Sequence, residues 1–235
     1  MWAHAQQLEP GWLTESEQAR LASIQKPPRR QEFVACRYAL RSLLANATTT
    51  AVEHWGLDAP EGRAPRLSSQ HHGAHAVATT HLTLSHSGKY LACAVAAQPV
   101  GVDIEVDNYR SSRRDPLALA AIACSACEVR QLHAADCEQS RRRMFVQWWS
   151  LKEAYFKCIG TGVDFSSVQR IECRLAQDGA ARVLAHGRSW SGKTTLGQYV
   201  VLSACSLDRS AWASALAGGA EIDWRGQSDW VLVAR

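Results

Sequence analysis

Two carboxylates stand two residues apart in an apolar stretch. Residues 100–106 alternate apolar and other side chains, as in a half-buried strand, and Asp103 and Glu105 project from the same face. On a strand such carboxylates lie about 6–7 Å apart, and two anions this close repel each other unless a cation or several donors lie between them. Hard oxygen ligands suit Mg²⁺, which usually shares its shell with substrate phosphates. The pair therefore predicts a magnesium site, although a solvated strand face explains it equally well.

A third carboxylate and a lysine follow two adjacent tryptophans. Helical spacing aligns three side chains along one stripe, namely Trp149, Glu153 and Lys157. An exposed Glu-to-Lys pair is one interpretation, and it would stabilise the helix by only about 0.3–0.5 kcal/mol. Two adjacent tryptophans, however, indicate a buried helix, in which a carboxylate needs a partner. A metal ion shared with the two strand carboxylates would supply that partner.

A polar turn follows the strand-like residues 82–84. Ser85, His86 and the backbone amides near Gly88 form a polar loop of the kind that binds phosphate oxygens. A Ser–His dyad for acyl transfer is the alternative. Adjacent residues on a strand point to opposite faces, however, so this pair cannot readily hydrogen-bond. The segment favours phosphate binding.

Residues 187–194 match the P-loop pattern G-x-x-x-x-G-K-[ST] in every position. That motif needs a preceding strand and a following helix. Residues 195–206 are rich in Val, Thr and Tyr and are typical of a strand, and only 41 residues remain after Thr194. We therefore predict a turn between two strands and no nucleotide-binding loop.

Eight cysteines are scattered along the chain, which indicates reduced thiols in a reducing compartment. Cys124 and Cys127 have C-x-x-C spacing, but zinc needs four ligands, so a metal site there is disfavoured. Ser125 and Glu128 instead fit the S-x-x-E capping box, in which each side chain bonds the other residue's backbone. We expect a helix to begin just after Ser125.

Four histidines crowd residues 70–81, namely His71, His72, His75 and His81. They lack the regular spacing of metal ligands. We interpret this segment as a polar surface loop.

The composition is that of an ordinary folded protein. The 235 residues are 46% hydrophobic and 20% charged, and a chain of this length folds without disulfide or metal staples. No apolar run approaches the ~20 residues of a membrane span, and the first residues lack the regions of a signal peptide. We expect a cytoplasmic protein without a membrane partner.

The net charge of +4 favours acidic partners, which include nucleotide cofactors, nucleic acid and acidic proteins. Basic residues are spread out, with short clusters at residues 29–30, 113–114 and 141–143. No RRM, KH or zinc-finger pattern is present, so we do not expect a nucleic-acid partner.

Two stretches of the chain echo each other. An arginine pair followed by Phe-Val occurs at residues 29–34 and again at 141–146, an offset of 112. The apolar run 90–95 finds a counterpart in 201–206, an offset of 111. A helix-like and a strand-like segment thus recur in the same order, which predicts a duplicated α/β unit.

We therefore predict an α/β (α+β) fold of two similar halves, residues 1–99 and 100–235. The junction falls near Pro99, where a proline separates two strand-like runs. The second half ends in a tail beyond about Ala211, which contains Trp212, Trp224 and Trp230.

Taken together, these elements resemble the Sfp-type 4′-phosphopantetheinyl transferases. The resemblance rests on Ser85-His86-Ser87-Gly88, on GVDIE at 101–105 and on WSLKEAYFK at 149–157. The last two motifs at this separation are a specific signature, and the helix start at Ser125 also resembles the family. The similarity covers about residues 29–206, and the family's pseudo-two-fold pair of α/β halves agrees with the internal repeat.

The resemblance implies roles for particular residues. Asp103, Glu105 and Glu153 look like the magnesium ligands, and Glu153 or a metal-bound water would take the proton of the attacking serine. Lys157 looks like the catalytic lysine that offsets charge on, or protonates, the departing nucleotide. The coenzyme A contacts would comprise Ser85, His86, Lys157, Arg29, Arg30, Arg37, Arg63 and Arg66. The family's Gly-Lys-Pro segment is altered here to residues 62–66, which leaves open the arginine that meets the 3′-phosphate.

The implied reaction is Mg²⁺-dependent transfer of 4′-phosphopantetheine from coenzyme A to a serine of an apo acyl or peptidyl carrier protein, with release of 3′,5′-ADP. We expect the enzyme to be a monomer. Carriers of fatty acid, polyketide, nonribosomal peptide and lysine metabolism all remain open. A non-catalytic coenzyme A binder is the alternative, but it would not need all three carboxylates.

Overall fold

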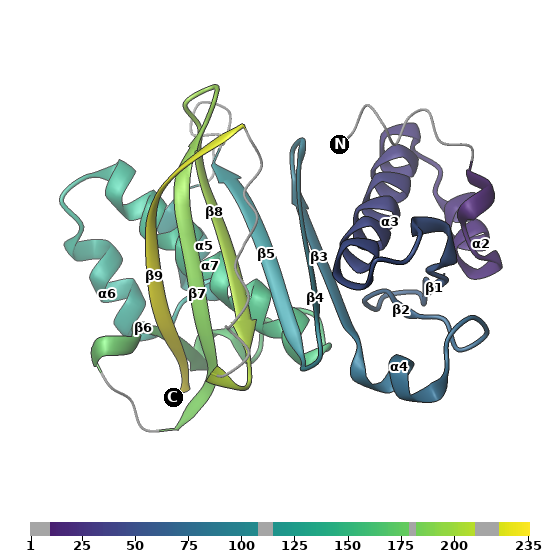
Figure 1. Cartoon of the computed structure of the whole chain (residues 1–235). Helices are drawn as coiled ribbons and strands as arrows, with labels where there is room; N and C mark the ends of the chain where they lie inside the picture. The colour runs from purple at the N-terminus through teal and green to yellow at the C-terminus, as the bar shows by residue number, and fades with distance from the viewer. Residues whose placement is uncertain (1–9, 108–114, 179–181, 210–220) are drawn as a thin grey trace. The chain divides into compact units, whose positions relative to one another are not determined.

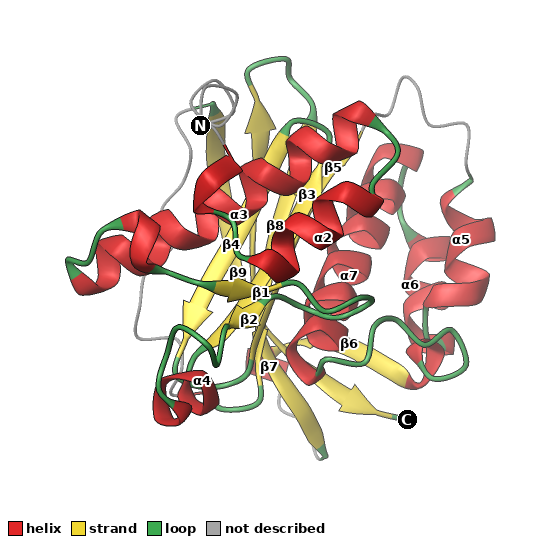
Figure 2. Ribbon diagram, turned by 90° about the vertical axis from the view of Figure 1, so that its right-hand side faces the viewer, coloured by secondary structure: helices red, strands yellow, loops and turns green. Residues whose placement is uncertain are grey.

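The computed structural model describes residues 10–107, 115–178, 182–209 and 221–235. The chain divides into two compact units. The first comprises Met1–Leu84 with Cys93–Gln98, and the second comprises Ser85–Ala92 with Pro99–Arg235. Helices and strands occur in both units (Figure 1 and Figure 2), so the predicted mixed α/β class is confirmed.

The described part of the first unit consists of three α-helices, two 3₁₀ helices and short strands. In chain order its elements are η1 (Pro10–Trp12), α2 (Glu15–Ser23), α3 (Pro27–Thr48), η2 (Val52–His54), β1 (Leu57–Asp58), β2 (Arg66–Leu67), α4 (Ala74–Thr79), β3 (His81–Ser87) and β4 (Tyr90–Ala96). Strands β1 and β2 pair antiparallel. Five buried leucines form the core, namely Leu40, Leu44, Leu57, Leu67 and Leu82.

Strands β3 and β4 form a two-stranded sheet of their own. Gly88 stands in the turn between them with φ of 57°, a left-handed conformation that favours glycine. The tip of this hairpin, residues 85–92, groups with the second unit. β4 ends at Ala96 and the next strand begins at Val100, so the predicted proline between two strands is confirmed.

In its described residues, the second unit has a five-stranded antiparallel sheet and three α-helices. Its elements are β5 (Val100–Asp107), α5 (Pro116–Ala123), α6 (Ala126–Ala134), α7 (Glu138–Ile159), η3 (Val168–Arg170), β6 (Ile171–Leu175), η4 (Ala176–Asp178), β7 (Val183–Thr194), β8 (Tyr199–Ser206) and β9 (Ile222–Ala234). The strand order is β5-β8-β7-β9-β6. Figure 1 and Figure 2 show α5, α6 and α7 on one side of this sheet.

The core of the second unit lies between α7 and the sheet. Trp148, Leu151 and Ala154 of α7 are buried in the same cluster as Cys205 of β8 and Leu232 of β9. Because α7 buries apolar side chains from Phe145 to Cys158, this part of the helix is held along the sheet. The polar side chains of its last turns are thereby brought to a fixed position beside β5.

The two helix pairs recur at a constant spacing. α3 and α7 each have 22 residues, and α2 and α6 each have nine. Every bound of the second pair lies 111 residues after the corresponding bound of the first, as from Pro27 to Glu138 and from Thr48 to Ile159. The offset of 112 deduced from the arginine pairs is therefore one too large, because Arg30 corresponds to Arg141. The pseudo-two-fold relation between the halves stays a prediction.

The capping box predicted at Ser125 is confirmed, and the first unit contains a second one. Ser125 Oγ accepts from the Glu128 amide, and the Glu128 carboxylate accepts from the Ser125 amide at 2.7 Å. Thr14 and Glu17 make the same two bonds at the start of α2. Both helix pairs thus begin with a capping box.

The predicted turn at residues 187–194 is wrong, because the whole segment lies inside strand β7. Its glycines allow close packing within the sheet. A β-carbon at Gly187 would lie 2.9 Å from Leu151 Cδ2, and one at Gly192 would lie 2.4 Å from the Asp223 carbonyl oxygen. The turn follows at residues 195–198, and the next element is strand β8, so the helix that a P-loop requires is not there.

Two other expectations need correction. Residues 222–234 of the predicted tail form strand β9, which pairs with both β6 and β7 and carries Trp224 and Trp230. Trp212 and residues 113–114 lie outside the described residues. The histidine-rich segment is not wholly a loop, because α4 forms within it and His81 begins β3.

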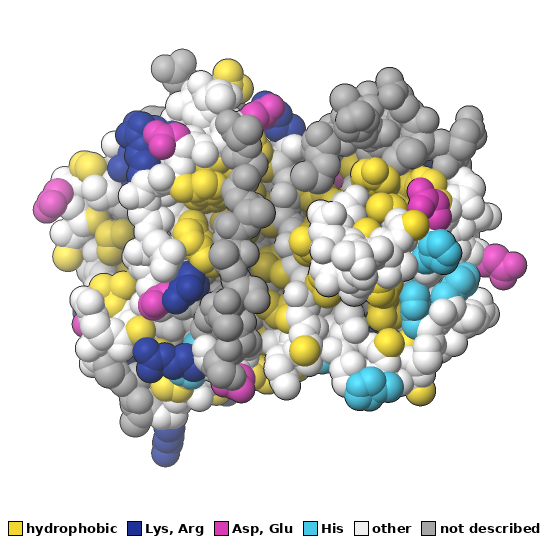
Figure 3. Space-filling model, in the orientation of Figure 1, with side chains coloured by type: hydrophobic (Ala, Val, Ile, Leu, Met, Phe, Trp, Pro, Cys, Tyr) yellow, Lys and Arg dark blue, Asp and Glu magenta, His cyan; other side chains and the backbone are white. Residues whose placement is uncertain are grey.

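Histidine side chains gather on the surface of the first unit (Figure 3). His72 Nε2 accepts from the Gly56 amide at 3.1 Å, and its ring stacks on Trp55 with centroids 5.2 Å apart. Burial lowers the pKa of His72, which keeps the imidazole neutral and able to accept this bond. His72 therefore has a structural contact.

No helix in the described part of the chain has the length and apolar character needed to cross a membrane.

Candidate active site

Helix α7 lies directly on strand β5 at Gly101. A β-carbon at this position would lie 1.8 Å from the carbonyl oxygen of Ala154, so only glycine permits the two backbones to approach this closely. Ser150 adds a second link, because its Oγ donates to the Asp103 carbonyl at 3.3 Å. The side chains of α7 are thereby presented to the carboxylates of β5.

Asp103 is the centre of the cluster. Its Oδ1 accepts from Lys157 Nζ at 2.7 Å and from Ser85 Oγ at 2.7 Å, and Lys157 also donates to Ser85 Oγ at 2.9 Å. Its Oδ2 is buried without a hydrogen-bond partner. Asp103 is 3% exposed, so an orphaned carboxylate oxygen here is costly unless a bound group compensates for it.

Glu105 and Glu153 stand in the field of Asp103. Burial, and then the charge of Asp103, raises the pKa of Glu105 to about 7, with Glu153 contributing in the same direction and Ser87 and Lys157 opposing. Burial and the same aspartate raise the pKa of Glu153, against the opposing charge of Lys157. The three carboxylates therefore interact electrostatically, and their mutual repulsion is only partly offset. Their role as metal ligands stays a prediction.

Lys157 pairs with Asp103, and this contact disfavours the exposed Glu-to-Lys pair as the interpretation of the stripe on α7. The Lys157 side chain is 27% exposed, and its ion pair crosses from the helix to the strand. A solvated pair with Glu153 along the helix surface is thus not its main interaction. Trp149, one turn before Glu153, stacks on Phe165 with ring centroids 6.3 Å apart.

The serines of β3 face this cluster. Besides the Ser85 contact with Asp103, Ser87 Oγ donates to Glu105 Oε2 at 3.3 Å and accepts from the Val106 amide at 3.1 Å. His86 lies between the two serines and is half-buried. Alternation along the strand places it on the opposite face, which disfavours the Ser–His dyad.

Within the described residues, no group of three or more His, Cys, Asp or Glu side chains stands in a ready metal-binding arrangement. The donor chemistry of the cluster nevertheless fits Mg²⁺. Three carboxylates supply hard oxygen ligands, one carboxylate oxygen is buried without a partner, and the raised pKa values of Glu105 and Glu153 reflect uncompensated negative charge. A divalent cation would relieve both conditions.

The five arginines predicted to contact coenzyme A all lie in the first unit. Several have partners there: Arg29 pairs with Glu32, Arg37 lies 3.7 Å from Glu17, and Arg66 pairs with Asp58. Arg30 donates to the Leu21 carbonyl at the end of α2, and Arg141 makes the equivalent bond to the Leu132 carbonyl. Arg63 is exposed. Arg30 thus has a structural contact that recurs in the second unit, and the coenzyme A roles of all five stay predictions.

Sequence reasoning missed three features of the site. It assigned no role to Ser87, although the residue lies inside the quoted motif, and it quoted Gly101 without its packing role. It also gave no role to Lys152, whose side chain is 1% exposed and ion-paired with Glu128 at 2.7 Å. A lysine at an apolar helix position was the available signal, because such a group needs a buried partner.

Comparison with known proteins gives consistent matches. The model of the 4′-phosphopantetheinyl transferase superfamily matches residues 99–206, which span β5 to β8. The chain is 28% identical over 179 residues to the 4′-phosphopantetheinyl transferase Sfp of Bacillus subtilis (strain 168), covering 73% of this chain and 75% of that protein. It is 36% identical over 101 residues to the 4′-phosphopantetheinyl transferase psf-1 of Bacillus pumilus, covering 43% and 40%. It is 28% identical over 180 residues to the 4′-phosphopantetheinyl transferase HetI of a Nostoc species, covering 76% and 71%.

Proposed function

From these matches we infer that the chain is a transferase of the 4′-phosphopantetheinyl transferase superfamily, and we propose its reaction on this basis. It moves the 4′-phosphopantetheine group of coenzyme A to a serine of an apo carrier protein, releases 3′,5′-ADP and depends on Mg²⁺. One observation carries the proposal. Asp103 holds Lys157 and Ser85 on one carboxylate oxygen and leaves the other buried and unpaired, next to Glu105 and Glu153.

The proposed metal ligands are Asp103, Glu105 and Glu153. Their oxygen donors and unrelieved negative charge support a divalent cation in this position. When bound, Mg²⁺ would neutralise charge on the diphosphate of coenzyme A. Ser87 supports this arrangement from β3, because its hydrogen bond to Glu105 restricts that carboxylate.

Transfer at phosphorus depends mainly on positioning and on neutralising charge. In the proposed reaction the serine Oγ of the carrier forms a bond to the β-phosphorus of coenzyme A. The bond from that phosphorus to the departing 3′,5′-ADP breaks, and the leaving phosphate keeps the electron pair. The proton of the serine passes to the Glu153 carboxylate, which acts as the general base.

Lys157 is proposed to stabilise the leaving nucleotide. Its ammonium is held at 2.7 Å from Asp103 but is still 27% exposed, so it can reach an incoming anion. A fixed cation at the point where charge develops lowers the barrier without reorganisation. The exposed Arg63 and the arginines Arg29, Arg37 and Arg66 are the proposed contacts for the remaining phosphates, with Ser85 and His86.

The proposed partner is an acyl or peptidyl carrier protein. The net charge of +4 supports recruitment of an acidic partner, an effect that acts mainly on the association rate. We propose that the enzyme acts as a monomer in the cytoplasm.

Intact mass spectrometry of the carrier tests the proposed function. The protein is incubated with coenzyme A, Mg²⁺ and a panel of apo carriers, and we expect at least one carrier to gain the mass of one phosphopantetheine group. EDTA and Asp103→Asn should each abolish the gain, whereas Asp229→Asn, at an exposed ion pair on β9, should leave it unchanged. Transfer by Asp103→Asn at the wild-type rate, or coenzyme A binding without transfer to any carrier, would contradict the proposal.

A further inference from the structure

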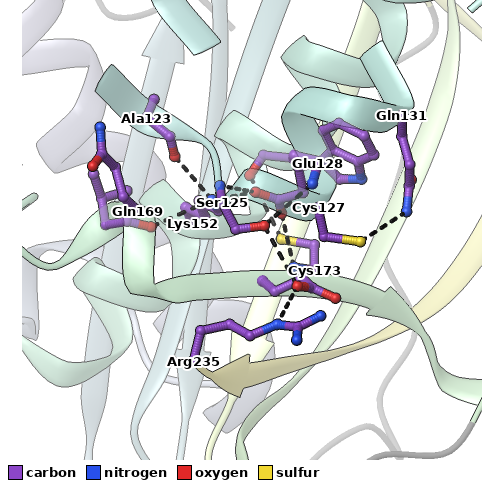
Figure 4. A network of polar contacts seen from close by, with 12 residues as sticks. Ala123, Ser125, Cys127, Glu128, Gln131, Lys152, Gln169, Cys173 and Arg235 are labelled. Atoms are coloured by element: carbon purple, nitrogen blue, oxygen red, sulfur yellow. Dashed lines mark hydrogen bonds and ion pairs between the residues drawn. The ribbon is translucent and has the colours of Figure 1, made fainter. Parts of the chain in front are cut away.

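A buried lysine lies one residue before Glu153 on α7. Lys152 is 1% exposed, and Figure 4 shows its side chain among acceptors from other segments of the second unit. Its Nζ donates to Glu128 Oε2 at 2.7 Å, to the Ala123 carbonyl at 2.8 Å and to the Val168 carbonyl at 3.3 Å. An ammonium has three donors, so all of them are used.

The partner, Glu128, is equally enclosed and equally satisfied. It is 0% exposed, and besides Lys152 it accepts from the Ser125 amide at 2.7 Å and from the Cys173 amide at 2.8 Å. The pair therefore connects α7 to the end of α5, the start of α6, η3 and β6. Figure 4 shows these residues converging from their separate elements.

Stability alone does not account for a buried ion pair at this place. Removing two charges from water is costly, and apolar side chains of similar volume often give equal or greater stability. What a fully hydrogen-bonded pair does provide is a single arrangement, because any shift of α7 would leave buried donors and acceptors without partners. The network thus fixes both the axial position and the rotation of α7.

We propose that Lys152 is a positioning residue, which sets where Glu153 and Lys157 stand relative to Asp103. The contacts of α7 with β5 hold one side of the helix, at Gly101 and Ser150, and the Lys152 network holds another. With both sides held, Glu153 has one position. This inference rests on the proposed function of the site, and it assigns to the network a role beyond holding the core together.

The first unit contains an equivalent buried ion pair, between Glu17 and Arg41, without the carboxylate cluster beside it. We call the two buried ion pairs and the helix contacts that recur with them the framework. Glu17 closes the capping box of α2, and its Oε1 accepts from Arg41 NH1 of α3 at 2.9 Å. Arg41 and Glu17 are both 0% exposed, and they lie 111 residues before Lys152 and Glu128. The residue after Arg41 is Ser42, so loss of this pair leaves the proposed metal ligands in place. Because Glu17 also contacts Arg37, a proposed coenzyme A contact, this control is compared with the other variant by Mn²⁺ affinity.

The test compares two double variants. Lys152→Met alone would strand the buried carboxylate of Glu128, so it is combined with Glu128→Gln, which removes the charge and keeps much of the volume. The control is Arg41→Met with Glu17→Gln. Mn²⁺, used as the probe for the metal, is titrated by electron paramagnetic resonance, and stability, kcat and the KM for coenzyme A are measured alongside.

We expect the Lys152 and Glu128 double variant to fold and to bind Mn²⁺ about 10–100-fold more weakly than the wild type, the usual loss when a ligand's support is removed. Its kcat should fall by a similar factor while the KM for coenzyme A changes little. The control should lose comparable stability and retain the wild-type Mn²⁺ affinity. A loss of Mn²⁺ affinity in the Lys152 and Glu128 double variant but not in the control would separate positioning from general destabilisation.

Wild-type Mn²⁺ affinity in the folded Lys152 and Glu128 double variant would overturn the inference, as would an equal loss of affinity in both double variants. If circular dichroism shows the double variant unfolded, Lys152→Gln with Glu128→Gln replaces it, because this pair removes both charges and keeps hydrogen-bonding groups at both positions. Unchanged Mn²⁺ affinity there has the same meaning. A wild type that binds Mn²⁺ but modifies no carrier would contradict the proposed function and leave the Lys152 comparison to stand on metal binding. A wild type that binds no Mn²⁺ would overturn both.

Discussion

The helix pair α2–α3 of the first unit and the pair α6–α7 of the second are built in the same way. In each, a capping-box glutamate at the start of the short helix forms a buried ion pair with a cation of the long helix. In each, an arginine of the long helix donates to a leucine carbonyl of the short one. These residues all lie 111 positions apart, so the chain uses one framework twice.

The chemistry-bearing residues do not recur with the framework. At the positions of Glu153 and Lys157 of α7, helix α3 has Ser42 and Asn46. Residues that recur in both helix pairs therefore hold the helices together, whereas residues found in only one of the two pairs are the candidates for function. By this rule Arg30 belongs to the framework, because Arg141 repeats its hydrogen bond.

The largest loss of stability from an uncharged substitution is expected at Gly101. Gly101→Ala would force the backbones of β5 and α7 apart, since its β-carbon would lie 1.8 Å from the Ala154 carbonyl. We expect the free energy of unfolding to fall by about 3 kcal/mol, the upper end for overpacking, and transfer to fall with it. Denaturant unfolding measures the change.

The matched control is Gly73→Ala in the first unit. A β-carbon there would meet nothing within 4 Å, and the backbone has φ of −62°, so the cost should stay within about 0.5 kcal/mol. Equal stability of the two alanine variants would show that α7 does not rest on β5 as described.

Alkaline pH should destabilise the protein through buried thiols in both units. The buried cysteines are Cys36 in the first unit and Cys124, Cys158, Cys173 and Cys205 in the second. Burial raises the pKa of Cys36 and Cys124 to about 12 and that of Cys158 to about 11. Because these pKa values are raised, the stability they contribute is complete below the unfolded-state pKa near 9 and is lost as pH rises towards 11–12.

Each such thiol should lower the free energy of unfolding by about 1.4 kcal/mol per pH unit above 9. Urea unfolding at pH 8 and pH 10 measures this loss, and Cys124→Ala should reduce it by about that amount. The exposed Cys137 is the control, because the hydrogen bonds from Ser140 lower its pKa, so Cys137→Ser should not reduce the loss. Equal stability of the wild type at both pH values would contradict the burial of these thiols.

The smallest effect on transfer is expected at Lys193, which matches the lysine of the P-loop pattern but lies within strand β7. Lys193→Ala should leave transfer within a few-fold of the wild type. A phosphate-binding lysine would instead cost about 1.5–3 kcal/mol, more than tenfold in affinity. Measurable ATP binding that disappears in this variant would restore the P-loop interpretation.

The elements that position the site could be predicted because their signals are local. The alternation around Asp103 and Glu105 predicted β5, and the S-x-x-E pattern at Ser125 predicted the start of α6. The two tryptophans before Glu153 predicted a buried helix. Each of these patterns depends on the periodicity of one segment or on its capping.

The remaining features depend on contacts between distant segments, which one sequence does not reveal. The partner of Lys152 lies 24 residues away in α6, and Ser87 reaches Glu105 from another strand. Residues 187–194 have turn-like composition, yet β8 and β9 flank them on both sides and make them a strand. Tertiary pairing here overrides local propensity.

Single-turnover transfer by Lys157→Met tests the central claim most directly, that the residues found in one copy only carry the chemistry. The substitution keeps the apolar stem and deletes the charge beside Asp103. At saturating coenzyme A we predict a rate about 10²-fold or more below the wild type, the usual scale for a positioned charge or proton donor. Asn46→Ala, at the corresponding position of α3, should leave the rate unchanged. A wild-type rate for Lys157→Met, with only slightly lower stability in a denaturant melt, would contradict the proposed catalytic role of Lys157 and show that this residue has a structural role only.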